Sequence, residues 1–168
     1  MASQAESSAN PIEVFYHGAA AAFTGRAESL LTMLSYSGAD YVLKTPQEVG
    51  WRSDSPEPFV GMGPPFLRVD GYLVSQRGAC MATLGKKLGF YPKTAADEAH
   101  ALQLTMNVTD MMAEKGQRQA MWNNIFESFL AANPDRANGG FVFGSSITYA
   151  DFDVLLATCL SKVFKVEV

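Results

Sequence analysis

The sequence predicts a mixed α/β half over residues 12–90 and an all-helical half over residues 95–168. Two short strand-like stretches flank an amphipathic helical stretch before residue 45, which is the pattern of a β-α-β unit. The pair Asp70-Gly71 joins two further strand-like stretches, and this dipeptide is a strong signal for a tight hairpin turn. Beyond residue 94 the apolar residues recur at helical spacing only, so a helical layer is expected to follow a small mixed sheet.

The first half is expected to hold four strands and two helices. Gly38 is placed to end the first helix, because glycine tolerates the left-handed conformation found after helix ends. A loop rich in Pro, Ser and Asp covers residues 50–63, and loops of this length are often functional. In chain order the expected elements are the strand IEVFYHG (12–18), the helix RAESLLTMLSYSG (26–38), the strand DYVLK (40–44), the hairpin PFLRVDGYLVS (65–75) and the helix QRGACMATLGKKLGF (76–90).

The second half is expected to hold three helices after a linker at residues 91–94. Thr94 and Asp97 have the spacing of a capping box, and Thr148 with Asp151 repeats it before the last apolar helix. Between these two helices, residues 119–133 carry an apolar stripe at helical spacing that ends before a proline. The stripe consists of Met121, Trp122, Ile125, Phe126, Phe129 and Leu130.

Composition excludes several classes of protein. The chain has 168 residues, 48% hydrophobic and 18% charged, which suits one globular domain or two small layers that share an interface. A formal charge of -4 leaves no cluster of Lys and Arg for nucleic acid, so nucleic acid is not an expected partner. No apolar run is long enough for a membrane-spanning segment to be expected.

Cysteine and histidine usage predicts no metal site. Cys80 and Cys159 lie in apolar helical runs and are expected to be buried thiols, without the spacing of metal or redox motifs. His17 is interpreted as a solvated side chain, and His100 has no spaced partner ligand. Residues 1–11 are expected to form a disordered tail without the features of a secretion signal, so a cytoplasmic or another reducing compartment is expected.

Three stretches carry a resemblance to a known family. They are EPFVGMGPPFLRVDG (57–71), VDGYLVSQRGACMATLGKKLGF (69–90) and FVFGSSITYADFDVL (141–155). In this order and spacing the chain resembles the cytosolic glutathione transferase superfamily, with the tyrosine-type, sigma-like branch as the nearest pattern. The resemblance implies a thioredoxin-like domain over residues 12–90 and an all-α domain over residues 95–168 that is shorter than in the family.

The resemblance implies a catalytic role for Tyr16, which stands where tyrosine-type members keep their thiol-activating residue. Their reaction is attack by the glutathione thiolate on an electrophile, and a free thiol has a pKa of about 8.5, so a hydrogen bond to sulfur is needed. A strand tyrosine that only packs is the alternative interpretation. The stretch HGAAAAFT (17–24) lengthens the connection to the following helix, which favours displacement of the Tyr16 hydroxyl. Thr24 or Ser29 is then a substitute donor.

The resemblance also assigns five glutathione-binding positions. Pro65 matches the family's cis-proline, and Pro64 precedes it where the family pairs a backbone N–H and C=O with the cysteinyl part of the tripeptide. Proline has no N–H, so half of that pairing is lost. Gln76 and Arg77 match the pair that holds the γ-glutamyl end, with Arg77 in place of a serine. Trp51 matches a tryptophan over the glycyl end, or else covers the sheet edge.

Two functions are therefore expected from different classes. The first is a glutathione transferase-like protein with a degenerate glutathione site, a binding or structural subunit in a homodimer or a larger protein assembly. The second is an active glutathione transferase that conjugates glutathione to small electrophiles through Tyr16. Glutathione, a small-molecule thiol, is the substrate implied in both cases, and no metal is expected. An uncovered apolar face of the short helical domain is expected to be a partner surface.

Overall fold

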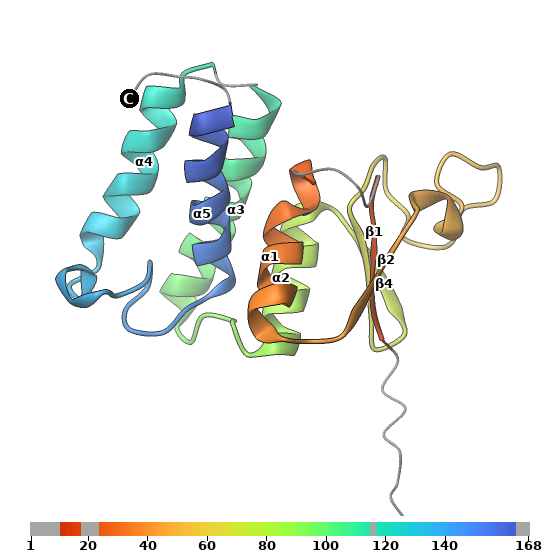
Figure 1. Ribbon diagram of the computed structural model, residues 1–168, viewed down its shortest axis with the longest axis horizontal. Coiled ribbons are helices and arrows are strands. Elements are labelled where there is room, and N and C mark those ends of the chain that lie inside the picture. The colour runs from red at the N-terminus through yellow and green to blue at the C-terminus, as the bar shows by residue number, and fades with distance from the viewer. Residues whose placement is uncertain (1–10, 18–23, 115–116, 164–168) are drawn as a thin grey trace, which may run out of the picture.

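The computed structural model describes residues 11–17, 24–114 and 117–163. The predicted tail at residues 1–11 lies outside these ranges except for Pro11. Within them, all four predicted strands and all five predicted helices are present. The chain is arranged in layers, with the sheet at one end, α1 and α2 beside it, α3 and α5 next, and α4 outermost (Figure 1).

The sheet has four strands in the order β2-β1-β3-β4. The strands are β1 (Ile12–Phe15), β2 (Tyr41–Lys44), β3 (Phe66–Val69) and β4 (Tyr72–Ser75). β2 lies parallel to β1, while β3 is antiparallel to both β1 and β4. Asp70 and Gly71 both adopt positive φ, 49° and 87°, which is the geometry of the tight turn that this dipeptide favours.

Five α-helices follow the predicted order. They are α1 (Glu28–Ser37), α2 (Arg77–Leu88), α3 (Ala95–Ala113), α4 (Gln119–Ala132) and α5 (Tyr149–Val163). Gly38 and Gly89 end α1 and α2 in the left-handed conformation. The Thr94 side chain accepts a hydrogen bond from the Asp97 backbone N–H, and Asp151 accepts one from the Thr148 backbone N–H at 2.7 Å. Both predicted caps therefore begin their helices.

One apolar core joins the sheet to the helical half. It contains Val14 and Leu67 from the sheet, Met81 from α2, Leu104 from α3 and Leu156 from α5, all at most 2% exposed. Helices from both halves of the chain therefore bury their apolar faces against each other.

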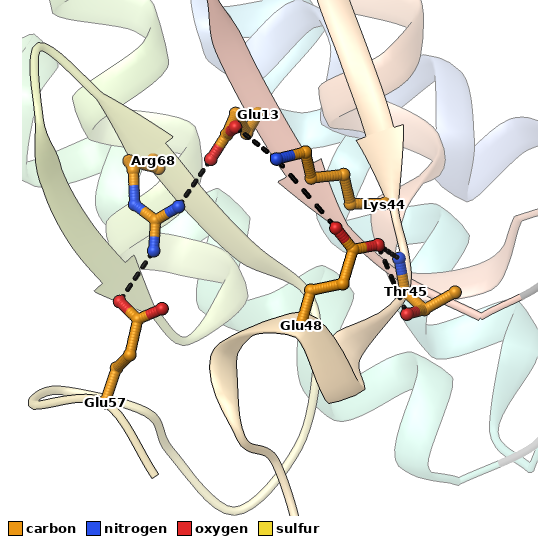
Figure 2. A network of polar contacts seen from close by, with 6 residues as sticks. All are labelled: Glu13, Lys44, Thr45, Glu48, Glu57 and Arg68. Carbon is orange, nitrogen blue, oxygen red and sulfur yellow. Dashed lines mark hydrogen bonds and ion pairs between the residues drawn. The ribbon is translucent and has the colours of Figure 1, made fainter.

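The opposite face of the sheet carries a smaller cluster and a charged network. Phe15, Val49, Trp51, Phe66 and Leu73 form the cluster, which the segment after the short helix η2 (Pro46–Val49) partly covers. Beside it, the Glu13 carboxylate accepts hydrogen bonds from Lys44 and from Arg68, each at 2.5 Å, and Arg68 also contacts Glu57 (Figure 2).

One sequence expectation about burial is wrong. Cys159 is exposed, whereas Cys80 is buried as expected. The apolar stripe of α4 is partly covered: Phe126 is 5% exposed, Phe129 and Leu130 are half-buried, and Met121 is 57% exposed. The reason is the outer position of α4, which has neighbours on one side only (Figure 1). In the part of the chain that the structure describes, no helix has the length and hydropathy of a transmembrane segment.

Candidate functional site

A pocket of about 230 Å³ lies where the loop before β3 meets the first turn of α2 and the region that leads into α1. It brings together four of the residues singled out from the sequence, Pro64, Pro65, Gln76 and Arg77. Arg26, Met62 and Gly63 complete its lining. Tyr16 and Trp51 do not line this pocket.

The peptide bond between Pro64 and Pro65 is cis, as predicted for Pro65. Pro65 is buried and Pro64 is partly exposed at the pocket wall. Pro64 therefore presents a carbonyl but no N–H to the pocket, because its ring nitrogen carries no hydrogen.

Gln76 is the exposed polar residue of the pocket. It precedes α2 with φ 73° and ψ 124°, a conformation that non-glycine residues rarely adopt. Such backbone strain occurs often where a side chain is held for binding. Its position directly before α2 also places it beside the free N–H groups of the first helical turn, which attract anions.

The Arg77 side chain turns away from solvent and into the helical half. Its Nη1 donates to the Thr105 carbonyl at 3.1 Å and lies 3.4 Å from the Thr109 hydroxyl. Its Nη2 donates to the Ser29 hydroxyl at 2.9 Å and forms an ion pair with Asp153. Only Nε has no hydrogen-bond partner among the described residues. A γ-glutamyl contact by Arg77 stays a prediction, and it now depends on Nε and the backbone N–H.

Asp153 is the buried partner that the sequence reasoning missed. It is fully buried on α5, and its second oxygen accepts a hydrogen bond from the Thr105 hydroxyl at 2.6 Å. Ser29 on α1, Arg77 on α2, Thr105 on α3 and Asp153 on α5 thus form one polar cluster between the layers. An aspartate inside an apolar helical stripe, together with Arg77 in place of the family's serine, was the available signal.

Tyr16 follows β1, and its hydroxyl accepts a hydrogen bond from the Arg26 backbone N–H at 3.0 Å. A Cβ atom on Gly25 would lie 2.8 Å from the same hydroxyl, so glycine allows this close approach. The longer connection therefore still brings Tyr16 to the start of α1. Because the hydroxyl accepts the Arg26 N–H, its own hydrogen remains available to a further acceptor.

Trp51 and His17 lie beside Tyr16 on the open face of the sheet. The Trp51 indole N–H donates to the Met62 carbonyl at 3.0 Å, and its side chain is buried in the smaller cluster. The His17 ring lies between Tyr16 and Trp51, with ring centroids 5.4 and 5.1 Å apart. Trp51 thus covers the sheet and anchors the loop before Pro64, one of its two predicted roles.

Neither substitute donor lines the pocket at Pro64. The Thr24 hydroxyl donates to the Glu28 carboxylate, and the Ser29 hydroxyl is buried and accepts from Arg77. Cys80 offers no replacement thiol, because burial raises its pKa to about 12. Among the described residues no group of three or more His, Cys, Asp or Glu is placed to hold a metal ion.

Comparison with known proteins identifies the fold. No protein family model and no curated protein sequence matches the chain. Three similar solved structures are glutathione S-transferases from Caenorhabditis elegans, Necator americanus and Onchocerca volvulus. Their sequence identities to this chain are 22%, 21% and 15%, with TM-scores of 0.67, 0.68 and 0.74. Each alignment covers 92% of this chain, and 83%, 82% and 78% of the respective neighbour.

These similarities establish the fold of the glutathione transferase superfamily, a thioredoxin-like sheet domain followed by a helical domain. The Necator americanus protein is described as monomeric, and the Onchocerca volvulus protein as a Pi-class enzyme. Those descriptions belong to the neighbours.

Proposed function

We propose that this chain is a glutathione transferase-like protein with a degenerate glutathione site, which acts as a binding or structural subunit of an assembly. The observation that carries the proposal is the Arg77 guanidinium, which pairs with buried Asp153 and not with groups in the pocket. At this position, where the family keeps a serine, the chain therefore has no hydroxyl. Most N–H donors of the Arg77 side chain are already hydrogen-bonded within the protein.

The pocket wall opposite α2 supports the same proposal. A backbone N–H at Pro64 is absent, so a tripeptide lying along this edge loses one hydrogen bond. That loss costs about 1 kcal/mol, or up to about 3 kcal/mol when the ligand carbonyl is left buried and unpaired. Together with the altered Arg77 position, the expected glutathione affinity is millimolar or weaker, below that of a working site.

Binding calorimetry with reduced glutathione tests the degenerate site. The wild-type chain should give a dissociation constant in the millimolar range or no heat, and Pro64→Val should bind about tenfold tighter because it restores the N–H. Pro58→Val is the matched control, because Pro58 is exposed in the preceding loop and lies outside the pocket lining. Low-micromolar binding by the wild type would refute the proposal.

The assembly role is supported by exposed apolar side chains near the pocket. Phe59 is 79% exposed and Met62 is 93% exposed, and both lie in the loop between η2 and β3. Large apolar side chains left in water favour contact with a partner. Sedimentation of the native protein in crude extract should give a mass well above 18.2 kDa. Migration as an 18.2 kDa species at micromolar concentration would count against the subunit role.

An active glutathione transferase is the second candidate, favoured by the Tyr16 hydroxyl. Since this hydroxyl accepts the Arg26 N–H, it can donate its own hydrogen to a thiolate sulfur. If this candidate is right, glutathione conjugation to a chromogenic electrophile should fall about 100-fold in Tyr16→Phe. Tyr72→Phe, at the exposed end of β4, should keep full activity. Equal rates in both variants would exclude the role of Tyr16.

A further inference from the structure

A second cavity lies in the helical half, at the other end of the molecule from the pocket at Pro64. It has a volume of about 570 Å³, which lies in the range of small-molecule sites. The first turn of α3, the last turn of α4 and the loop 142–144 form its walls. In Figure 1 these segments lie at the lower end of the helical layers, whereas α1 and α2 begin at the upper end.

The cavity is held open by hydrogen bonds within its walls. The buried Asn133 side chain follows α4 and donates to the carbonyls of Phe141 and Gly144. The Val142 N–H donates to the Asp151 carboxylate at 2.8 Å, which ties the same loop to the start of α5. These bonds fix the loop before any ligand arrives, so little ordering cost remains for binding.

Part of the cavity lining is apolar and aromatic. Phe129, Val142 and Phe143 form it, and the His100 ring stands edge-on to Phe129 with centroids 5.9 Å apart. His100 is exposed, and its ring contact with Phe129 extends this wall. A flat aromatic ligand suits such a wall, because ring contacts are favourable both edge-on and offset.

The same lining also carries negative charge. The Asp97 carboxylate belongs to it, and one of its oxygens accepts a hydrogen bond from the Thr94 hydroxyl at 2.7 Å. The last turn of α4 also faces the cavity, and this turn has no basic residue. Carbonyl groups at a helix C-terminus carry partial negative charge, which a cation stabilises. Asp97 and the α4 carbonyls therefore both favour a positively charged group.

From this combination we infer that the cavity binds small aromatic amines, with the ring on the wall of Phe129 and Phe143 and the ammonium group at Asp97. The neighbouring cavity shares Asp97, Phe143 and Gly144, and it leaves room for substituents on the amine. This site is independent of glutathione and of the function proposed above, because none of its residues lines the pocket at Pro64.

Tryptamine and indole-3-propionate provide a matched pair of probes, since they share the ring and differ in the charge of the chain end. Titration calorimetry on the full chain should give tryptamine binding at least about fivefold tighter than indole-3-propionate. Amide NMR shifts induced by tryptamine should concentrate in residues 97–100, 128–133 and 142–144. Equal binding of the two probes, or shifts centred elsewhere, would overturn the inference.

Two neighbouring carboxylates on α3, Asp97 and Glu98, distinguish a specific contact with the ammonium group from a general effect of negative charge. Asp97→Asn should weaken tryptamine binding about fivefold and leave indole-3-propionate unchanged or tighter. Glu98→Gln removes the same charge one residue away, outside this cavity, and should change either affinity less than twofold. Phe129→Ala should weaken both probes alike. Equal losses for Asp97→Asn and Glu98→Gln would contradict the assignment of Asp97.

Discussion

At the residue scale, Arg77 connects the pocket at Pro64 to the helical half. A buried guanidinium is costly unless it is paired, and here Asp153 supplies the opposite charge while Thr105 and Ser29 supply acceptors. Arg77 thus pairs with an aspartate 76 positions later in the chain. The residue lines the pocket at Pro64, and its side chain also holds the layers together.

Breaking this ion pair should destabilise the fold strongly. Arg77→Met and Asp153→Leu should each lower the free energy of unfolding by about 3–5 kcal/mol, because each leaves a buried group without its partner. The double variant Arg77→Met/Asp153→Leu should lose much less than the sum. Arg26→Met, in the same pocket but outside the network, should change stability by less than about 0.5 kcal/mol. Additive losses in urea unfolding would contradict the coupling.

Glu13 forms a network of ion pairs with Lys44 and Arg68 on the face of the sheet that lies opposite the helices (Figure 2). Desolvation raises the pKa of its carboxyl, but hydrogen bonds from Lys44 and Arg68, and their charges, outweigh this and leave the pKa below its usual 4.5. A lowered folded-state pKa means that the ionised form stabilises the fold above pH 4.5. This stabilisation is lost as the pH falls through the lowered value.

The stability of Glu13→Gln should accordingly depend less on pH. At pH 7 the free energy of unfolding of the variant should be about 1 kcal/mol lower than that of the wild type, and this difference should shrink as the pH falls below 4.5. Glu127→Gln removes a carboxylate from an exposed pair with Arg136 and should leave the acid profile unchanged. Urea unfolding at a series of pH values measures both. A constant difference down to pH 3 would contradict the role of Glu13.

At the element scale, α2 and α5 approach closely because Gly85 has no side chain. A Cβ atom at Gly85 would lie 2.8 Å from Cδ1 and 3.1 Å from Cβ of Tyr149, closer than atoms in proteins pack. Tyr149 is 1% exposed and begins α5, so it has little freedom to move. The contact between α2 and α5 therefore requires glycine at position 85, although alanine there would increase the helix propensity of α2.

Substitution at two glycines of α2 tests this contact. Gly85→Ala should destabilise the protein by about 1–3 kcal/mol, because overpacking outweighs the gain in helix propensity. Gly78→Ala is the matched control in the same helix, where the nearest atoms to a Cβ lie at 3.5 and 3.6 Å on Thr105 and Met106. It should be neutral or slightly stabilising. Thermal unfolding measures the stability of both variants. Wild-type stability in Gly85→Ala would show that α5 shifts to make room for the added methyl group.

At the scale of the whole molecule, the sheet and the helical half share one apolar core. Residues from β1 and β3 and from α1, α2, α3, α4 and α5 belong to a single cluster. The buried polar cluster around Arg77 and Asp153 lies between the same layers. Neither half keeps its buried apolar face without the other, so both are expected to unfold together.

The two tryptophans report on this cooperativity, since Trp51 lies in the sheet half and Trp122 on α4. In Trp122→Phe the fluorescence follows the sheet half, and in Trp51→Phe it follows the helical half. Within each variant the midpoint of urea unfolding by fluorescence should coincide with the midpoint by far-ultraviolet circular dichroism. Separate midpoints in either variant would contradict a shared core.

The sequence alone determined the elements and their order, because local signals decide them. Asp70-Gly71 fixes a hairpin by its conformational preference, and the caps at Thr94 and Thr148 begin helices through side chains three residues apart. Pro65 identified the loop at the pocket. The exposure of Cys159 was not predicted correctly, since exposure depends on which face of a helix the neighbouring layers cover.

The tertiary structure decided which side chains meet. It turned Arg77 toward Asp153 and brought the Tyr16 hydroxyl to Arg26 despite the longer connection. It also formed the aromatic cavity at Asp97 from segments separated by about 45 residues. Contacts of this kind depend on how layers pack, and each combines residues whose sequence separation leaves no periodic or local signal. The pocket could be located from the sequence, but the direction of its key side chain could not.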